Sequence, residues 1–132
     1  MRLMLDTNIC IYIINQRPQS VIDRFAVFPV GAIGVSTITV AELEYGAAKS
    51  AQSRKNREAL QQFFSALEVA AFDNRAAEVY GKIRIALEKQ GQLIGAMDLL
   101  IAAHALSLGV RLVTNNEREF KRVAGLRVEN WV

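Results

Sequence analysis

Short apolar runs alternate along the chain with longer segments in which apolar residues recur every three to four positions. The short runs predict buried strands, and the spacing of three to four predicts helices. Strands that alternate with helices predict an α/β fold with a parallel sheet covered on both faces, although the pattern does not fix the strand order. We expect strands at 2–5, 33–36, 68–72, 111–114 and 127–129, and helices at 8–15, 18–28, 39–50, 53–67, 97–108 and 117–123. A further helix is expected after Asp73, which could cap it, because apolar residues from Ala76 to Leu87 recur at helical spacing.

The segment 97–108 is apolar on almost every side, so we expect a buried helix. His104 follows Asp98 by six residues, which places it roughly 120° around a helix from that carboxylate. The only histidine is therefore predicted to be a core or interface residue. Cys10, the only cysteine, is predicted to be a small buried apolar residue on the first helix.

The composition predicts one domain over residues 1–132, because no repeat, linker or low-complexity stretch interrupts the pattern. A single cysteine cannot form an intrachain disulfide, and it makes a reducing compartment the expectation. Asp6 and Asn8 interrupt the apolar run of the N-terminus, which argues against a signal peptide. No apolar segment is long and clean enough to cross a bilayer. We expect a soluble protein of the cytoplasm, with no membrane contact.

Four carboxylates occupy equivalent places in this pattern. Asp6 follows the first strand directly, and Glu42 and Asp98 are expected in the first turns of their helices. Glu119 follows the fourth strand. In open parallel sheets, ligand sites form outside the carboxyl ends of the strands. We therefore expect these four acids to converge at one edge of the sheet.

Taken singly, each acid has a structural explanation. Thr39 and Glu42 fit a capping box, and Asn116 and Glu119 resemble one. A helix N-terminus favours an acid such as Asp98, and Asp6 suits a turn. For Asp98 this explanation is the weakest, because a carboxylate in an apolar helix is costly unless it is paired or bound to a metal.

Taken together, the acids predict a cation site. Converging carboxylates repel one another, and ligand sets made only of oxygen suit Mg²⁺, for which Mn²⁺ can substitute. Such a site supports phosphoryl chemistry in which an activated water attacks and no covalent nucleophile is needed. Neither GxGxxG nor GxxxxGK[ST] is present, which weakens dinucleotide and P-loop alternatives.

Five segments in this order and spacing resemble the PIN-domain toxins of the VapC family, from bacterial VapBC type II toxin–antitoxin systems. They are MLDTN, TVAELEYGA, GAMDLLIAAHA, LVTNNEREF and the closing LRVENW. The resemblance runs over nearly the whole chain. It implies a PIN-like three-layer α/β/α sandwich with a central parallel sheet of four to five short strands. It also implies a Mg²⁺-dependent endoribonuclease.

The resemblance carries catalytic and metal-binding roles onto individual residues. The first three acids of the family correspond to Asp6, Glu42 and Asp98. A fourth acid, which follows the late strand in many PIN domains, is replaced here by Asn116, and we expect Glu119 to take its place. Thr7, Asn8, Thr114 and Asn116 itself are the implied supporting polar residues.

The resemblance also implies the substrate and the partners. Family members cut structured RNA, commonly tRNA, and relatives in this subgroup cut initiator tRNA in the anticodon region. A VapB antitoxin inhibits them by laying its tail, often with an arginine, on the acidic groove. DNA is contacted only through that antitoxin, and homodimers are common.

Charge is consistent with an RNA substrate. Sixteen basic and thirteen acidic residues give a net charge of +3, so outside a cluster of four acids the balance is +7. Phosphate contacts from such a surface would position RNA without reading its sequence. The candidates for these contacts are Lys49, Arg54, Lys55 and Arg118.

Three alternatives remain open at this point. A haloacid-dehalogenase-like phosphatase needs Asp-x-Asp, but the chain has Asp6-Thr7-Asn8. A non-catalytic Mg²⁺-binding regulatory module would use Asp73 after the third strand and a late lysine, yet Thr114-Asn115 follows the fourth strand. The third alternative is a PIN fold that acts only through its partner, for which Asn116 in place of an acid is the argument.

Overall fold

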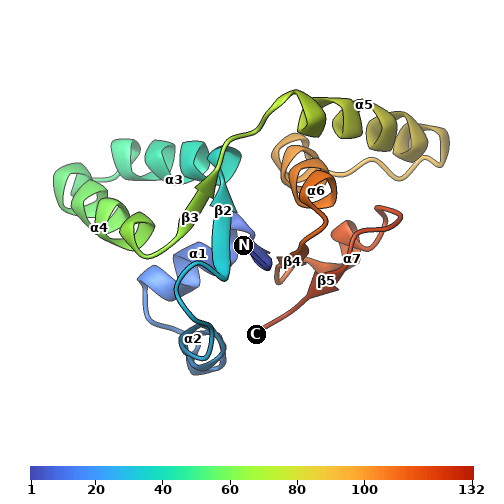
Figure 1. Cartoon of the computed structure of the whole chain (residues 1–132). Helices are drawn as coiled ribbons and strands as arrows, with labels where there is room; N and C mark the ends of the chain where they lie inside the picture. Colours follow the sequence, from blue (N-terminus) through green and yellow to red (C-terminus); the bar gives the residue numbers. More distant parts are fainter.

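A five-stranded parallel sheet forms the centre of the molecule (Figure 1). The structure, a computed structural model, describes residues 1–132. The strands lie in the order β3-β2-β1-β4-β5, and every neighbouring pair is parallel. Their bounds are β1 (Leu3–Leu5), β2 (Ile33–Ser36), β3 (Glu68–Ala70), β4 (Arg111–Val113) and β5 (Val128–Glu129).

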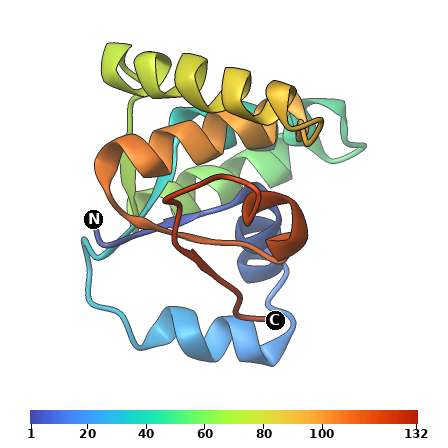
Figure 2. The same ribbon diagram turned by 90° about the vertical axis from the view of Figure 1, so that its right-hand side faces the viewer.

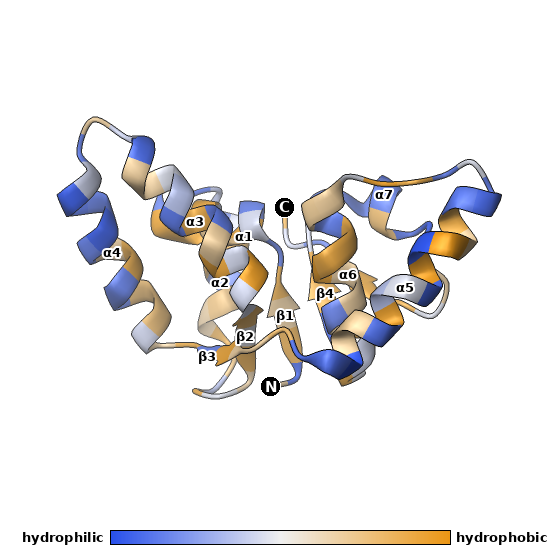
Figure 3. Cartoon of the chain, turned by 90° about the horizontal axis from the view of Figure 1, so that it is seen from above, coloured by the Kyte–Doolittle hydropathy of each residue, from blue (hydrophilic) through white to orange (hydrophobic).

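Seven helices cover the two faces of this sheet, which confirms the predicted three-layer α/β/α fold. Figure 3 shows α1–α4 on one side of the strands and α5–α7 on the other. The first group is α1 (Thr7–Ile14), α2 (Gln19–Ala26), α3 (Thr37–Lys49) and α4 (Ser53–Ser65). The second is α5 (Asn74–Lys89), α6 (Ala96–Leu108) and α7 (Glu117–Phe120).

Alternation along β1 explains why two layers of helices are needed. Leu3 and Leu5 are fully buried in the core that includes α1–α4, whereas Met4 is fully buried in the core that includes α5 and α6. Successive side chains of a strand point to opposite faces, so an unbroken apolar strand must be covered twice. The same chain segment therefore contributes to two separate hydrophobic cores.

The strand order places a topological switch point beside β1. The chain passes from β1 to β2 and then to β3 on one side, and β4 returns to the other side of β1. The crevice at such a point lies outside the carboxyl ends of the strands that flank it. Here those ends are followed by Asp6 after β1 and by Thr114 after β4. The sequence pattern predicted the edge but not which two strands meet there.

The start of α3 differs from the prediction. The helix begins at Thr37 rather than at Thr39, because the Ser36 hydroxyl caps it by accepting a hydrogen bond of 3.0 Å from the Ile38 amide. Glu42 therefore lies in the second turn and not in the first. The capping box predicted for Thr39 and Glu42 is wrong, since both residues are inside the helix.

Other boundaries shift by a few residues. The third strand ends at Ala70 instead of residue 72, and α7 ends at Phe120 instead of residue 123. Asp73 caps α5 as expected, since its carboxylate accepts the Ala76 amide at 3.0 Å. No helix of the structure combines the length and the apolar character that a membrane span requires.

His104 and Cys10 are both buried, as predicted. The Nδ1 atom of His104 lies 2.7 Å from the Ser36 hydroxyl, and its ring meets the Phe72 ring edge-on at 5.4 Å between centroids. Burial lowers the pKa of His104, with a weaker opposing influence from Asp73. Burial is also the largest cause of the raised pKa of the Cys10 thiol. Neither side chain forms a hydrogen bond with the four candidate carboxylates, so both residues belong to the core.

Gly34 on β2 provides a test of the packing. A Cβ atom at this position would lie 2.5 Å from the Cε atom of Met1 and 2.6 Å from the backbone oxygen of Glu68. We expect Gly34→Ala to lower the free energy of unfolding by about 1–3 kcal/mol, because a neighbouring strand cannot move aside cheaply. Chemical denaturation measures this change.

Gly81→Ala is the matched control for Gly34→Ala. A Cβ at Gly81, in the middle of α5, would meet nothing within 4 Å. This variant should raise the stability by about 0.5–1 kcal/mol through helix propensity alone. Equal effects of the two substitutions would contradict the close strand packing at Gly34.

Candidate active site

Asp6 is the most buried acid of the candidate site, with only 3% of its surface exposed. One carboxylate oxygen accepts the Thr7 amide at 2.8 Å and so caps α1, while the other accepts the Thr114 hydroxyl at 2.7 Å. Burial raises the pKa of Asp6, which these two hydrogen bonds partly offset and the Glu42 charge increases. Strands β1 and β4 are thus joined at the switch point through this carboxylate.

Glu42 is brought to Asp6 by a threonine. The Thr7 hydroxyl donates to the Glu42 carboxylate at 2.6 Å and lies 3.2 Å from the Thr39 hydroxyl. Thr7 is the first residue of α1, which follows β1, and Glu42 lies in the second turn of α3, which follows β2. The N-terminal parts of these two helices therefore come together here. The predicted supporting role of Thr7 therefore has a structural counterpart.

Asp98 lies in the first turn of α6, where the sequence pattern placed it. Its carboxyl has a pKa raised to about 6, first by burial and then by the charges of Asp6, Glu119 and Glu42. The Asn116 amide lowers this pKa by a smaller amount. The charges of Asp6, Glu119 and Glu42 therefore all act on Asp98, although the four acids come from four separate parts of the chain.

Glu119 is held by Asn116, the residue expected to stand in place of a fourth acid. The Asn116 side-chain amide donates to the Glu119 carboxylate at 3.2 Å, and the Asn116 backbone amide donates to the Thr114 hydroxyl at 2.9 Å. Asn116 precedes α7 but makes no side-chain cap, so the predicted resemblance to a capping box is wrong. Thr114 connects this turn to Asp6, and its supporting role in the site stays a prediction.

The donors fit a hard cation in kind, since all are oxygen atoms and the charges of Asp6, Glu119 and Glu42 oppose the ionisation of Asp98. As they lie, however, no three acidic, histidine or cysteine side chains come close enough to hold one ion together. Mg²⁺ does not require such a cage, because it keeps several waters and commonly takes only one or two protein carboxylates. The residues present therefore fit a partly hydrated cation better than an enclosed one.

Other predicted residues lie elsewhere. Asn8 is exposed on α1, and no hydrogen bond ties its side chain to the acids. Lys49 ends α3, and Arg54 and Lys55 begin α4, so these three gather at the far end of one helix pair. Arg118 is exposed on α7 beside Glu119. The four basic candidates thus form two separate groups.

Two residues near these positions were missed by the sequence analysis. Thr39 is fully buried against Thr7, and its position one turn before Glu42 on the same helix face was the available signal. Tyr45 is 66% exposed, and the Lys49 ammonium lies 4.9 Å from its ring centroid. An exposed aromatic ring next to a cation is a surface on which a base can stack.

Comparison with known proteins adds a family to this geometry. The PIN domain family model matches residues 3–126. Ribonuclease VapC2 from Haemophilus influenzae is 48% identical over 132 residues, covering all of this chain and 99% of the relative. The tRNA(fMet)-specific endonuclease VapC from Shigella flexneri is 45% identical over 131 residues, covering 99% and 98%.

Solved structures of VapBC complexes contain chains that are similar to this one in sequence and in fold. The VapBC2 complex from Rickettsia felis bound to a promoter DNA fragment contains a chain of 41% identity with a TM-score of 0.92, and both chains are covered completely. The DNA-bound VapBC complex from Salmonella typhimurium gives 42% identity and a TM-score of 0.94, with 100% and 99% covered. The predicted resemblance and the predicted endoribonuclease class are confirmed. The chain belongs to the PIN domain family and, within it, to the VapC ribonucleases.

Proposed function

We propose that this VapC-type toxin is a divalent-metal-dependent endoribonuclease that cuts tRNA at the Asp6 edge of the sheet. The observation that carries the proposal is the pKa of Asp98, which burial in the first place and then the charges of Asp6, Glu119 and Glu42 raise to about 6. Perturbed carboxylates at a switch point mark a functional site more often than a structural one.

Mg²⁺, with Mn²⁺ as a substitute, is the proposed cation. Asp6 and Asp98 would bind it directly. Glu42 and Glu119 would contact it through bound water or would bind a second metal ion. When bound, such an ion supplies activation of water and neutralisation of phosphate charge. The chain contributes orientation: Thr7 and Thr114 fix the two oxygens of Asp6, and each oxygen keeps a free lone pair.

The RNA is proposed to run outward from this edge over basic residues. Lys49, Arg54 and Lys55 lie at the end of the α3–α4 pair, and Arg118 lies beside Glu119. Arg54 shares an exposed ion pair of 3.8 Å with Glu58, which is too weak to keep it from a phosphate. The relative from Shigella flexneri is named for tRNA(fMet), and we propose the anticodon region of initiator tRNA as the first substrate to test.

The proposed partner is a VapB antitoxin, as in the related complexes. A mostly apolar hollow of about 290 Å³ adjoins Thr7 and Glu42 and is lined also by Ile11 and Leu60. An antitoxin tail can place apolar side chains there and an arginine on the acids, where it would replace the charge of the cation. DNA contact would come through the antitoxin, and we propose a homodimer that acts in the bacterial cytoplasm, where tRNA is found.

Family membership argues against the phosphatase and regulatory-module alternatives. One experiment distinguishes a catalytic toxin from a PIN fold that acts only through its partner. Antitoxin-free protein should cut initiator tRNA at one or a few positions with Mg²⁺, and not with EDTA. Sequencing of the product ends measures this. Discrete cuts that persist in EDTA would contradict the metal, and the absence of cuts in folded protein across several RNAs would contradict catalysis.

A further inference from the structure

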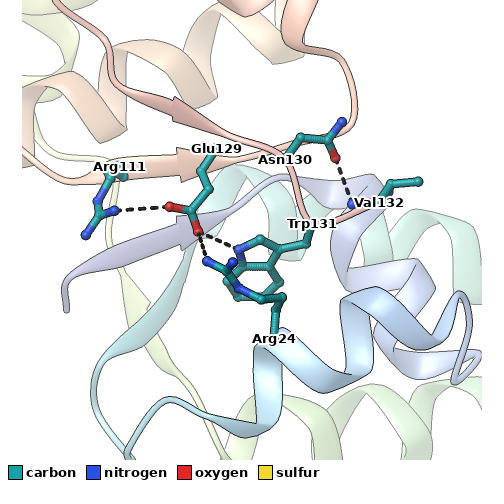
Figure 4. A network of polar contacts seen from close by, with 6 residues as sticks. All are labelled: Arg24, Arg111, Glu129, Asn130, Trp131 and Val132. Carbon is teal, nitrogen blue, oxygen red and sulfur yellow. Dashed lines mark hydrogen bonds and ion pairs between the residues drawn. The ribbon is translucent and has the colours of Figure 1, made fainter.

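The last residues of the chain form a network that ties the sheet to α2 (Figure 4). The Glu129 carboxylate accepts hydrogen bonds from Arg24 on α2 at 3.0 Å, from Arg111 on β4 at 3.0 Å, and from the Trp131 indole at 2.6 Å. Trp131 is 3% exposed and stacks on Phe28 at 5.7 Å between ring centroids. Figure 2 shows this segment, in red, running from the sheet toward α2.

Asn130 takes no part in that network, although it lies in the sequence between Glu129 and Trp131, the two residues that anchor the segment. Its side-chain amide donates to the Glu117 carboxylate at 3.1 Å and to the Asn115 side-chain oxygen at 3.3 Å. Its own oxygen accepts the Val132 amide at 2.9 Å. The hydrogen bonds of this side chain therefore reach the chain end, the turn between β4 and α7, and the first residue of α7.

This turn carries part of the candidate active site. Asn115 and Glu117 flank Asn116 in the sequence, and the Asn116 amide is the group that holds Glu119. On the opposite side, the Asn115 amide donates to the Tyr12 hydroxyl of α1 at 3.3 Å. At its base, the Thr114 amide donates to the Glu129 backbone oxygen at 2.9 Å. The turn is thus fixed from β5, from α1 and from Asn130.

We infer that Asn130 is a positioning residue for the reaction: it sets the β4–α7 turn so that Asn116 and Glu119 face Asp98. The inference rests on the proposed function. Trp131 and Glu129 anchor the segment through buried and charge-assisted contacts, and Asn130 uses that anchored segment as a fixed support. Residues that orient the groups of a metal site in this way affect activity about 10–100-fold while contributing little to the fold.

The test compares Asn130→Ala and Asn130→Asp with the wild-type protein in tRNA cleavage. We expect kcat to fall about tenfold or more and KM for RNA to stay within about twofold, because three of the four proposed phosphate contacts, Lys49, Arg54 and Lys55, lie on α3 and α4. The melting temperature should move by no more than about 2 °C, as for other surface substitutions. Gln19→Ala is the matched control, since it removes an exposed amide–carboxylate hydrogen bond of 2.8 Å to Asp23 on α2.

An exchange of groups gives the decisive comparison. Asn130→Asp combined with Glu117→Gln reverses donor and acceptor across the same contact, so it should recover most of the kcat lost in Asn130→Asp alone. An unchanged kcat in Asn130→Ala, or a loss that the double variant does not recover, would overturn the inference.

A second readout does not depend on cleavage. Hydrogen–deuterium exchange of the amides of residues 115–119 should be faster in metal-free Asn130→Ala than in the wild type and Gln19→Ala. If the wild-type protein cuts no RNA, the proposed function fails, and exchange still decides the positioning role: faster exchange supports it, and unchanged exchange overturns it.

Discussion

Asp6→Asn should lower the rate of RNA cleavage by about a thousandfold or more. Asp6 is the acid at the switch point, and its carboxylate is joined both to the β4 turn through Thr114 and, through Thr7, to Glu42. An amide is a poor ligand for a hard cation and carries no charge. If the transition state loses several kcal/mol of charge stabilisation, the rate falls by about a thousandfold or more.

The fold should survive this substitution. Asparagine caps helices about as well as aspartate, so the hydrogen bond from the Thr7 amide is kept. The substitution removes a buried negative charge, whose burial raises the pKa of Asp6, and this gain offsets the disturbed contact with Thr114. We expect a melting temperature within a few degrees of the wild type or above it, measured by circular dichroism in EDTA.

Asp73→Asn is the matched control for Asp6→Asn. Asp73 also caps a helix with its carboxylate, but it caps α5 rather than α1. Cleavage should therefore be nearly unchanged in this variant. Unfolding of Asp6→Asn with full activity in any folded fraction would show that Asp6 is only a structural cap. Equal loss of activity in both variants would point to capping rather than chemistry.

The difference between these two aspartates shows how far a sequence can predict this protein. Strand and helix positions follow from apolar spacing, so the layers, the five strands and the placement of Asp6 after β1 could be predicted. Local chemistry also predicted the Asp73 cap. What a local pattern cannot show is that β4 returns beside β1, because strand order depends on contacts between residues about a hundred positions apart, such as Thr114 and Asp6.

The sequence predicted which acids belong to the candidate site, but not the hydrogen bonds that connect them. Asp98 stood out because charge is costly in an apolar helix, and Glu42 because it follows a strand at the equivalent place. Thr39 was predicted only as a cap, and Asn130 did not stand out, since a polar residue in a helix or at a chain end is ordinary until its partner is known. The error at the start of α3 has a similar origin: Ser36 ends a buried strand and caps the next helix at once, and either role is compatible with its sequence.

Asp98→Asn should also remove cleavage, by about a hundredfold or more, while making the metal-free protein more stable at neutral pH. Its carboxyl has a pKa of about 6 in the fold against an ordinary value of 3.8, because of burial and the charges of Asp6, Glu119 and Glu42. An activity lost together with a stability gained is the pattern of a group kept for function.

The sign of the pH dependence follows from the raised pKa. The folded state binds the Asp98 proton more tightly than the unfolded chain does, so this group stabilises the fold fully below about pH 3.8. That contribution is lost as the pH rises through about 6. Asparagine does not titrate, so the variant should melt higher than the wild type at pH 7.5, and the difference should shrink toward pH 4.5. The lowered pKa of His104 affects both proteins alike and cancels in this difference.

Thermal unfolding of both proteins in EDTA across this pH range is the measurement, with Glu78→Gln on the exposed side of α5 as the control for removing an acid. Added Mg²⁺ should raise the melting temperature of the wild type more than that of Asp98→Asn, because a ligand stabilises the state that binds it. Lower stability of Asp98→Asn at pH 7.5 would mean that this carboxylate is a structural acid of α6. A gain equal to that of Glu78→Gln would mean that net charge, and not repulsion among the four acids, sets the effect.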